Sequence, residues 1–96
     1  MMHARVTTFQ IQPGKFDEVI RLFESLVPKS EQGFVTGLLL TDRAANKAIT
    51  VTVWQTLADL NASDAYRQQQ IASSQVAALL TGKPVTEVCE VAVRVP

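Results

Sequence analysis

The sequence predicts an α+β fold whose elements follow the order strand, helix, strand, strand, helix, strand. Four segments are rich in β-branched, aromatic or other apolar residues typical of strands, and the third and fourth of them alternate with a period of two. Another segment places apolar residues three and four positions apart, which is typical of a helix with one buried face, and a further segment carries a weaker apolar stripe of the same kind. Proline and glycine residues stand between these segments, where elements are expected to end.

Length and composition limit the class of protein. The 96 residues suit one domain, so residues 1–96 are predicted to form a single unit. Hydrophobic residues make up 47% of the chain, and this apolar surface is enough to offset the entropy of ordering. Nine basic and nine acidic residues are scattered along the chain, so no basic patch indicates a nucleic-acid partner.

The start of the chain and its single cysteine bear on the cellular compartment. The segment MMHARVTTFQ lacks the features of a signal peptide, and no apolar run approaches the roughly 18 residues of a spanning helix. Cys89 has no intrachain partner, which agrees with a reducing compartment. We expect Cys89 to be a small buried hydrophobe, with a reactive thiol as the alternative. The predicted compartment is the cytoplasm, without a membrane partner.

The first strand is predicted over residues 3–11, HARVTTFQI, and Pro13 with Gly14 ends it. Pro28 disfavours helical dihedral angles at Val27, so the helix that follows should end about there. The buried stripe of this first helix is formed by the apolar residues Phe16, Val19, Ile20, Phe23 and Val27.

The second and third strands are predicted as a hairpin. Gly33–Asp42 forms the second strand, Arg43–Asn46 a polar loop, and the third strand runs from Lys47 to about Gln55. Successive side chains of a strand point to opposite sides, so three residues of the third strand share one face. These residues, which combine an indole with two hydroxyls, are Thr50, Thr52 and Trp54.

The second helix is predicted to begin near Leu57. Thr56 and Asp59 resemble a capping box with Asp in place of Glu, which would satisfy backbone N–H groups of the first turn. Ser73 and Ser74 are expected to interrupt this helix before a second helical segment over residues 75–80. Gly82 is well placed to end the helical region.

The last strand is predicted over residues 85–95, VTEVCEVAVRV, with Cys89 and three valines on one face. The complete order is the ferredoxin-like β-α-β-β-α-β arrangement, a four-stranded antiparallel sheet with two helices on one face. Three of the strands are apolar on both faces, although the helices cover only one. The uncovered face therefore predicts pairing with a second copy of the chain.

The whole chain resembles the antibiotic biosynthesis monooxygenase family, within the dimeric α/β-barrel superfamily. The motifs that carry the resemblance are Gln12–Lys15 (QPGK), Gly33–Gly37 (GFVTG) and Thr52–Gln55 (TVWQ). The resemblance implies a homodimer whose sheets pack face to face into a barrel, with a pocket in each protomer between sheet and helices. Relatives include oxygenases of polycyclic aromatic compounds without metal or cofactor, haem-degrading enzymes, proteins that act on small signalling molecules and proteins without known chemistry.

The candidate pocket residues combine the third-strand face with the second helix. They are Trp54, Thr50, Thr52, Tyr66, Gln70 and His3. Trp54 is either a packing residue or a substrate contact. The resemblance implies an Asn at position 50 in some oxygenases and a His near position 70 in many relatives. Thr50 lacks the paired donor and acceptor of an amide, and Gln70 cannot transfer a proton.

Other polar residues give weaker signals. His3, the only histidine, is either a proton-transfer group or a solvated end residue. The Tyr66 hydroxyl would orient a ligand if its helix face turned towards the sheet, and would otherwise lie at the edge of the core. Arg5 and Arg94 are predicted on outer strands, in solvated or dimer-edge roles.

No metal site and no cofactor are predicted. One His and one Cys far apart supply no chelating spacing, and the haem-degrading branch of the family uses an Asn, a second Trp and a His that are not matched here. The first functional hypothesis is a cofactor-independent monooxygenase that acts on a small apolar or aromatic, quinol-like compound. The second is a non-catalytic small-ligand-binding or accessory dimer. A third is an isomerase or cyclase, which needs His3 or Glu90 in the pocket.

Overall fold

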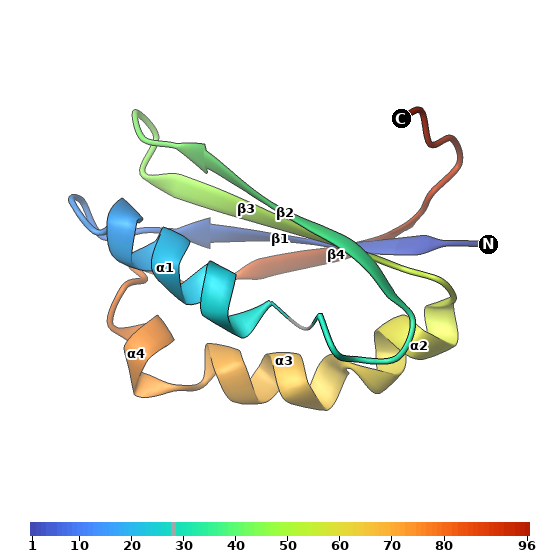
Figure 1. Cartoon of the computed structure of the whole chain (residues 1–96). Coiled ribbons are helices and arrows are strands. Elements are labelled where there is room, and N and C mark those ends of the chain that lie inside the picture. The colour runs from blue at the N-terminus through green and yellow to red at the C-terminus, as the bar shows by residue number, and fades with distance from the viewer. Residues whose placement is uncertain (28) are drawn as a thin grey trace.

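A computed structural model describes residues 1–27 and 29–96 of the chain. It confirms the predicted ferredoxin-like order, with a four-stranded antiparallel sheet and all helices on one face (Figure 1). The elements are β1 (His3–Gln10), α1 (Phe16–Leu26), β2 (Phe34–Asp42), β3 (Lys47–Trp54), α2 (Leu57–Ala62), α3 (Asp64–Ile71), α4 (Ser74–Ala77) and β4 (Val85–Glu90).

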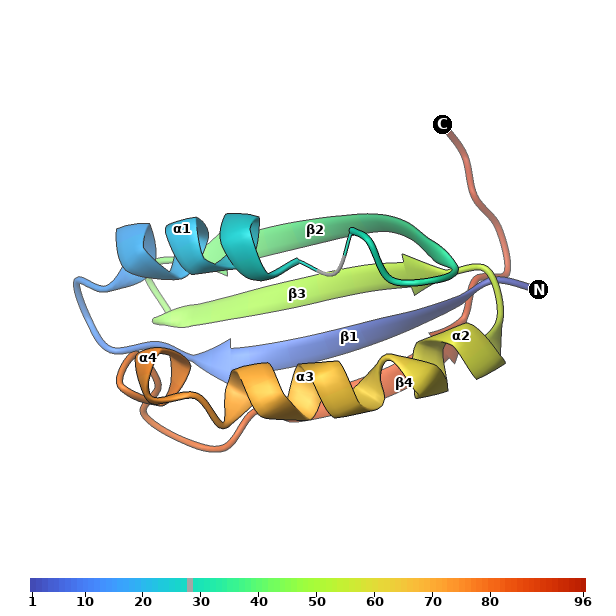
Figure 2. The same ribbon diagram turned by 60° about the horizontal axis from the view of Figure 1, so that its bottom comes forward.

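The strands lie in the order β2-β3-β1-β4, so β1 and β3 are the inner strands. The helix α1 lies over the β2 side of the sheet, and α3 runs along the β1 and β4 side (Figure 2). In the β1–β3 register Arg5 is paired with Thr52, and Thr7 is paired with Thr50. These four side chains point to the same face, the face that the helices cover.

The centre of the hydrophobic core lies at one end of the sheet. Ile11, Phe16 and Ala48 are buried together there, and Phe9 and Leu39 are among the side chains that pack against them. Phe16 opens α1 shortly after a turn at Pro13 and Gly14, the two residues that were predicted to end the first strand. This end therefore joins the first residues of α1 to the inner strands and fixes the position of α1 over the sheet.

The first helix ends at Leu26, one residue before the predicted end. Pro28, on which that prediction was based, lies outside the described residues. The hairpin is as predicted, because residues 43–46 form the turn between β2 and β3. In the described part of the chain, no helix is long and apolar enough to cross a membrane.

The helical region after β3 begins as predicted but contains an additional break. Thr56 is the N-cap of α2, and its hydroxyl accepts a hydrogen bond from the Asp59 backbone N–H at 3.0 Å. The predicted interruption near residue 73 separates α3 from α4, whereas a second break at Ser63 separates α2 from α3. The Leu60 carbonyl accepts hydrogen bonds there from Ser63 Oγ at 2.7 Å and from Arg5 Nη2 at 2.8 Å. These side-chain donors compete with helical backbone bonding, which explains a break that no proline or glycine signals.

The last strand is shorter than predicted. β4 ends at Glu90, which is paired with His3 at the start of β1, and the Val91 N–H donates to the Met2 carbonyl at 2.9 Å. Residues 91–96 carry no regular structure and extend away from the sheet on the face opposite the helices (Figure 1). Valine alternation alone does not make a strand, since a strand needs a neighbour, and β1 offers no residues beyond its own start.

Cys89 is exposed in the single chain, contrary to the prediction of a buried residue. It is paired with Ala4 in the register of β4 with β1, so its side chain lies on the face that the helices leave open. An apolar pattern marks a face that can be buried. It does not show whether the chain's own helices or another molecule cover that face.

Candidate functional site

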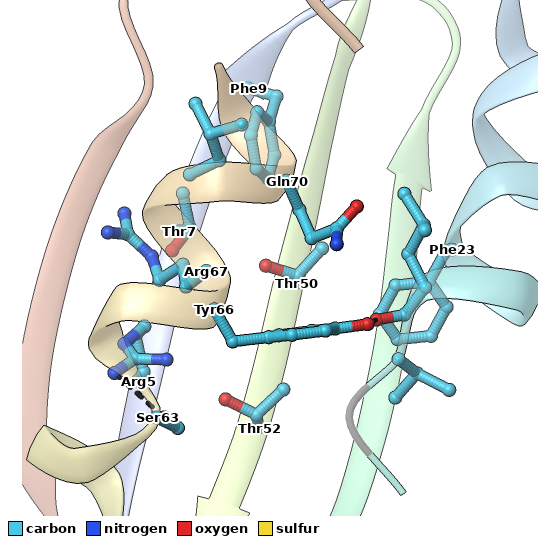
Figure 3. A pocket seen from close by; sticks show the side chains of 13 residues that line it. Arg5, Thr7, Phe9, Phe23, Thr50, Thr52, Ser63, Tyr66, Arg67 and Gln70 are labelled. Carbon is cyan, nitrogen blue, oxygen red and sulfur yellow. Dashed lines mark hydrogen bonds between the residues drawn. The ribbon is translucent and has the colours of Figure 1, made fainter. Parts of the chain in front are cut away.

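A cavity of about 120 Å³ lies between the helix layer and the inner strands. β1 and β3 contribute its floor, while α1 and α3 contribute its two sides (Figure 3). A second cavity of about 130 Å³ adjoins it. The residues that border both cavities are Phe9, Phe23, Leu26, Thr50, Gln70 and Ile71. The two spaces therefore form one elongated site beneath the helices.

The two ends of this site differ in polarity. The second cavity has almost entirely apolar walls, to which Ile11, Leu39 and Leu79 contribute. The opposite end has Arg5, Ser63 and Arg67 along one side, as Figure 3 shows. A ligand would therefore meet apolar surface over most of its length and hydrogen-bond donors at one end.

Four of the six candidate residues from the sequence line the cavity: Thr50, Thr52, Tyr66 and Gln70. Tyr66 extends from α3 towards Phe23 on α1, across the space in front of β3 (Figure 3). Its hydroxyl donates a hydrogen bond to the Leu26 carbonyl at 2.9 Å. Because that bond uses the only hydroxyl proton, Tyr66 can offer a ligand only the lone pairs of its oxygen.

Trp54 does not line the cavity. Its side chain is fully buried at the end of β3, where Nε1 donates to Thr52 Oγ1 at 3.1 Å and the ring makes an edge-on contact with Phe34 at 5.5 Å between centroids. The interpretation of Trp54 as a packing residue therefore describes its place in the fold. Trp54 also holds the Thr52 hydroxyl in a fixed orientation, because that hydroxyl accepts the indole hydrogen bond.

His3 does not line the cavity either. It is paired with Trp54 at the start of β1, and its Nδ1 lies 3.1 Å from the Met1 carbonyl oxygen. Glu90, the other proton-transfer candidate of the isomerase hypothesis, is exposed on β4. The cavity thus has neither of the groups which that hypothesis requires.

The prediction for Arg5 is wrong. β1 is an inner strand, and Arg5 is only 6% exposed, with its guanidinium at the polar end of the cavity. The spatial order of the strands depends on how the helices cross the sheet, so the pattern of a single strand does not reveal whether it is an inner or an outer strand. The sequence did hold a signal, since Arg5 has the same strand parity as Thr7, Phe9 and Ile11. Arg94 lies beyond β4 and is exposed.

Ser63 and Arg67 were also missed by the sequence analysis. Arg5 Nη2 donates to Ser63 Oγ at 3.3 Å and to Asp64 Oδ1 at 3.3 Å. Arg67 Nη1 lies 3.8 Å from the same Asp64 oxygen, and Arg67 Nη2 donates to Thr86 Oγ1 on β4. Ser63, Asp64 and Arg67 all lie at the first turn of α3, beside the break between α2 and α3.

Burial lowers the pKa of Arg5 below its ordinary value, and the positive charge of Arg67 lowers it further. Asp64 acts in the opposite direction and raises the pKa. Asp64 is 54% exposed, so solvent screens much of its attraction for the two guanidinium groups. The positive charge at this end of the cavity is therefore only partly compensated within the chain.

Among the described residues that line the cavity there is no His, Cys, Asp or Glu side chain. Across residues 1–27 and 29–96, no three such residues are grouped in a way that could hold a metal ion. The groups available to a ligand are hydroxyls, one amide, two guanidinium groups and apolar surface. This set can bind and orient a ligand, and any proton-transfer chemistry depends on the ligand's own acidity.

The sheet, its one-sided helix layer and the cavity between them define a ferredoxin-like α+β protein with an internal ligand-sized site. The model of the family "antibiotic biosynthesis monooxygenase" matches residues 2–70. The chain belongs to the antibiotic biosynthesis monooxygenase family. No curated protein matches the sequence.

Solved structures of similar fold come from several bacteria. NE2512 of Nitrosomonas europaea, a protein of unknown function, has a TM-score of 0.77 at 18% identity over 99% of this chain and 94% of that one. A mutant form of SnoaB, a cofactor-independent oxygenase from Streptomyces nogalater, has a TM-score of 0.73 at 19% identity over 99% and 97%. The haem degrader MhuD from Mycobacterium tuberculosis has a TM-score of 0.76 at 17% identity over 98% and 99%. At these identities the likeness shows the fold.

Proposed function

We propose that this protein is a cofactor-independent monooxygenase that acts on a small aromatic, quinol-like compound. The observation that carries the proposal is the elongated, largely apolar cavity beneath α1 and α3, whose floor holds the Thr50 and Thr52 hydroxyls. The family to which the chain belongs, and its structural likeness to the cofactor-independent oxygenase SnoaB, support the reaction class.

The size of the site suits a ligand with more than one ring. An apolar cavity of about 150 Å³ in another protein holds one benzene molecule. The two adjoining cavities measure about 120 and 130 Å³ and share six lining residues. A flat compound of two or three fused rings would fill them both, with Phe9 and Phe23 against its faces or edges.

The reaction that fits such a substrate needs no external reductant. In an anthrone, the carbon between two aromatic rings carries two hydrogens, and one molecule of O₂ converts it to a carbonyl. One oxygen atom enters the product, and the other leaves as water with the two hydrogens. All four electrons come from the substrate carbon. The chain's contribution is to hold the ring system and to hydrogen-bond its oxygen through Thr50 or Gln70.

Oxygen uptake with a panel of anthrones and hydroquinones tests this proposal. We expect the wild-type protein to consume O₂ faster than the buffer does with at least one anthrone. Thr50→Val removes one hydroxyl and keeps the shape of the side chain, so we expect the rate to fall about tenfold. Thr41→Val makes the same change at an exposed position on β2, outside the cavity, and should leave the rate unchanged. Uptake at the buffer rate with every compound would contradict the proposal for this substrate class.

A second candidate is a non-catalytic ligand-binding protein, which the absence of His and carboxylate side chains from the cavity walls favours. The same compounds distinguish the two functions. Binding of an anthrone under nitrogen, followed by no oxygen uptake in air, supports the second function. Turnover supports the first.

We also propose that the protein is a homodimer formed through the open face of the sheet. Leu38 and Leu40 on β2 and Val85 on β4 are 54%, 49% and 61% exposed. In the register, Leu38 is paired with Val51 and Leu40 with Ile49, which places these side chains on the same open face. A second copy would bury this apolar surface symmetrically.

A further inference from the structure

The polar end of the cavity contains two guanidinium groups in a largely apolar site. Arg5 is 6% exposed, and the Arg67 side chain is 17% exposed. Both lie on the side of the cavity opposite Phe23 (Figure 3). A buried arginine is costly unless its donors have partners, so the partners of these donors determine what the pair can still bind.

Within residues 1–27 and 29–96, the hydrogen bonds of Arg5 occupy one of its three side-chain nitrogens. Its hydrogen bonds to Leu60, Ser63 and Asp64 are all made by Nη2. No fully buried side-chain nitrogen in the described part of the chain lacks a partner, so Nε and Nη1 of Arg5 keep some exposure. Because the Arg5 side chain borders the cavity, a donor of either nitrogen that faces it is available to a molecule inside.

The local charge also favours an anion. Two guanidinium groups share one carboxylate, Asp64, which lies 3.3 Å from Arg5 and 3.8 Å from Arg67. Asp64 is on the exposed first turn of α3 rather than among the cavity walls. An anionic oxygen inside the cavity would meet the uncompensated charge in surroundings of lower dielectric constant than those of Asp64.

A purely structural role explains part of this arrangement. Arg5 Nη2 ties β1 to the junction of α2 and α3, and Arg67 ties α3 to Thr86 on β4. That role does not use Nε and Nη1 of Arg5, and it does not require a second cation beside the first.

We propose that the cavity selects aromatic ligands that carry an anionic oxygen, a carboxylate or phenolate, bound by Arg5 and Arg67 with the ring system in the apolar part of the site. The inference rests on the proposed function only in taking the same cavity as the ligand site. For an oxidisable phenol, the arrangement would hold the ionised form, which is the form that gives up electrons readily.

The test compares naphthoate with its neutral isostere naphthamide by titration calorimetry under nitrogen. We expect the wild-type protein to bind naphthoate at least about tenfold more tightly, as a charge-assisted hydrogen bond predicts. In Arg67→Met the preference should fall to within about twofold, while Arg67→Lys should keep part of it. Arg21→Met removes the same charge from the exposed side of α1 and should leave the preference unchanged.

Asp64→Asn is expected to change the naphthoate affinity in the opposite direction, at the same end of the cavity. It removes the carboxylate that competes for both arginines, so naphthoate affinity should rise severalfold while naphthamide affinity stays the same. A merely structural role of the arginines would alter both affinities together. Because Asp64 is half exposed, this variant also avoids the risk that a core substitution prevents folding.

Equal affinity for the two ligands in the wild-type protein overturns the inference, and so does the absence of binding by either. Neither binding measurement involves oxygen. A failure of oxygen uptake would therefore contradict the proposed monooxygenase reaction without contradicting the anion preference. Equal binding of the two ligands would contradict the anion preference without contradicting the reaction.

Discussion

Gly33 illustrates how single residues of this chain are constrained by backbone geometry. Its φ of +80° lies in the region that side chains disfavour, and its carbonyl accepts a hydrogen bond from the Gln55 N–H at 2.8 Å. A Cβ at this position would also collide with the Asp59 side chain at the start of α2. Gly14 has the same φ of +80° but open space around it. Substitutions at the two positions therefore distinguish the energetic cost of backbone strain from the cost of steric collision.

We predict that Gly33→Ala lowers the free energy of unfolding more than Gly14→Ala does. Gly14→Ala should cost about 1 to 2 kcal/mol, the penalty of the left-handed conformation. Gly33→Ala should cost this amount and a further contribution from the collision. Gly82→Ala is the control, because its φ is not positive and nothing lies within 4 Å. Urea denaturation measures all three, and equal losses for Gly14 and Gly33 would contradict the steric part.

The break between α2 and α3 lies at the polar end of the site. Ser63 is buried there, donates to the Leu60 carbonyl and accepts from Arg5. Ser63 and Arg67 are four residues apart, about one helical turn, so they share one face at the start of α3, at the end of the cavity where Arg5 lies. The short α2 consequently depends on its N-terminal cap, since it contains only residues 57–62.

We predict that Thr56→Ala lowers the free energy of unfolding by about 1 kcal/mol, the usual contribution of an N-cap side chain. The substitution removes the oxygen that accepts a hydrogen bond from the Asp59 N–H at 3.0 Å. Thr56→Ser keeps that oxygen and should retain most of the stability. Urea denaturation with circular dichroism provides the measurement. Equal stability of Thr56→Ala and the wild type would show that the cap contributes nothing.

At the scale of the whole molecule, the helices cover one face of the sheet and leave an apolar face open (Figure 1). The exposed residues of this face, Leu38, Leu40 and Val85, belong to both edge strands. The exposed Cys89 belongs to the same face. Apolar surface of this extent is stabilised by contact with another molecule, and a second copy offers a matching surface.

We predict that the wild-type protein sediments as a dimer at micromolar concentration and that Leu38→Lys shifts it towards the monomer. The lysine places a charge on the proposed interface, where it would have to be desolvated. Leu57→Lys is the matched control, because Leu57 is 42% exposed on α2, on the helix side of the sheet. A wild-type monomer at this concentration would overturn the proposed dimer. Dissociation by Leu57→Lys would contradict the proposed face.

Local sequence patterns predicted the structure correctly where the structure has a local physical cause. The period of the apolar residues predicted each strand and the first helix, the Thr56 cap predicted the start of α2, and the polar residues 43–46 predicted the hairpin turn. The face shared by Thr50 and Thr52 follows from strand geometry alone, and it forms the floor of the cavity. The valines of residues 91–95 show the limit, because strand propensity without a neighbouring strand leaves the segment irregular.

The fold class, the family and the strand face on which the cavity is built follow from periodicity and short motifs, which the amino-acid sequence contains. The enclosure of Trp54 in the core and the burial of Arg5 on an inner strand beside Arg67 follow from the packing of distant elements. Burial and electrostatic environment depend on which elements are neighbours in space. Residues 5 and 67 become neighbours only after β1 is placed at the centre of the sheet and α3 is laid across it.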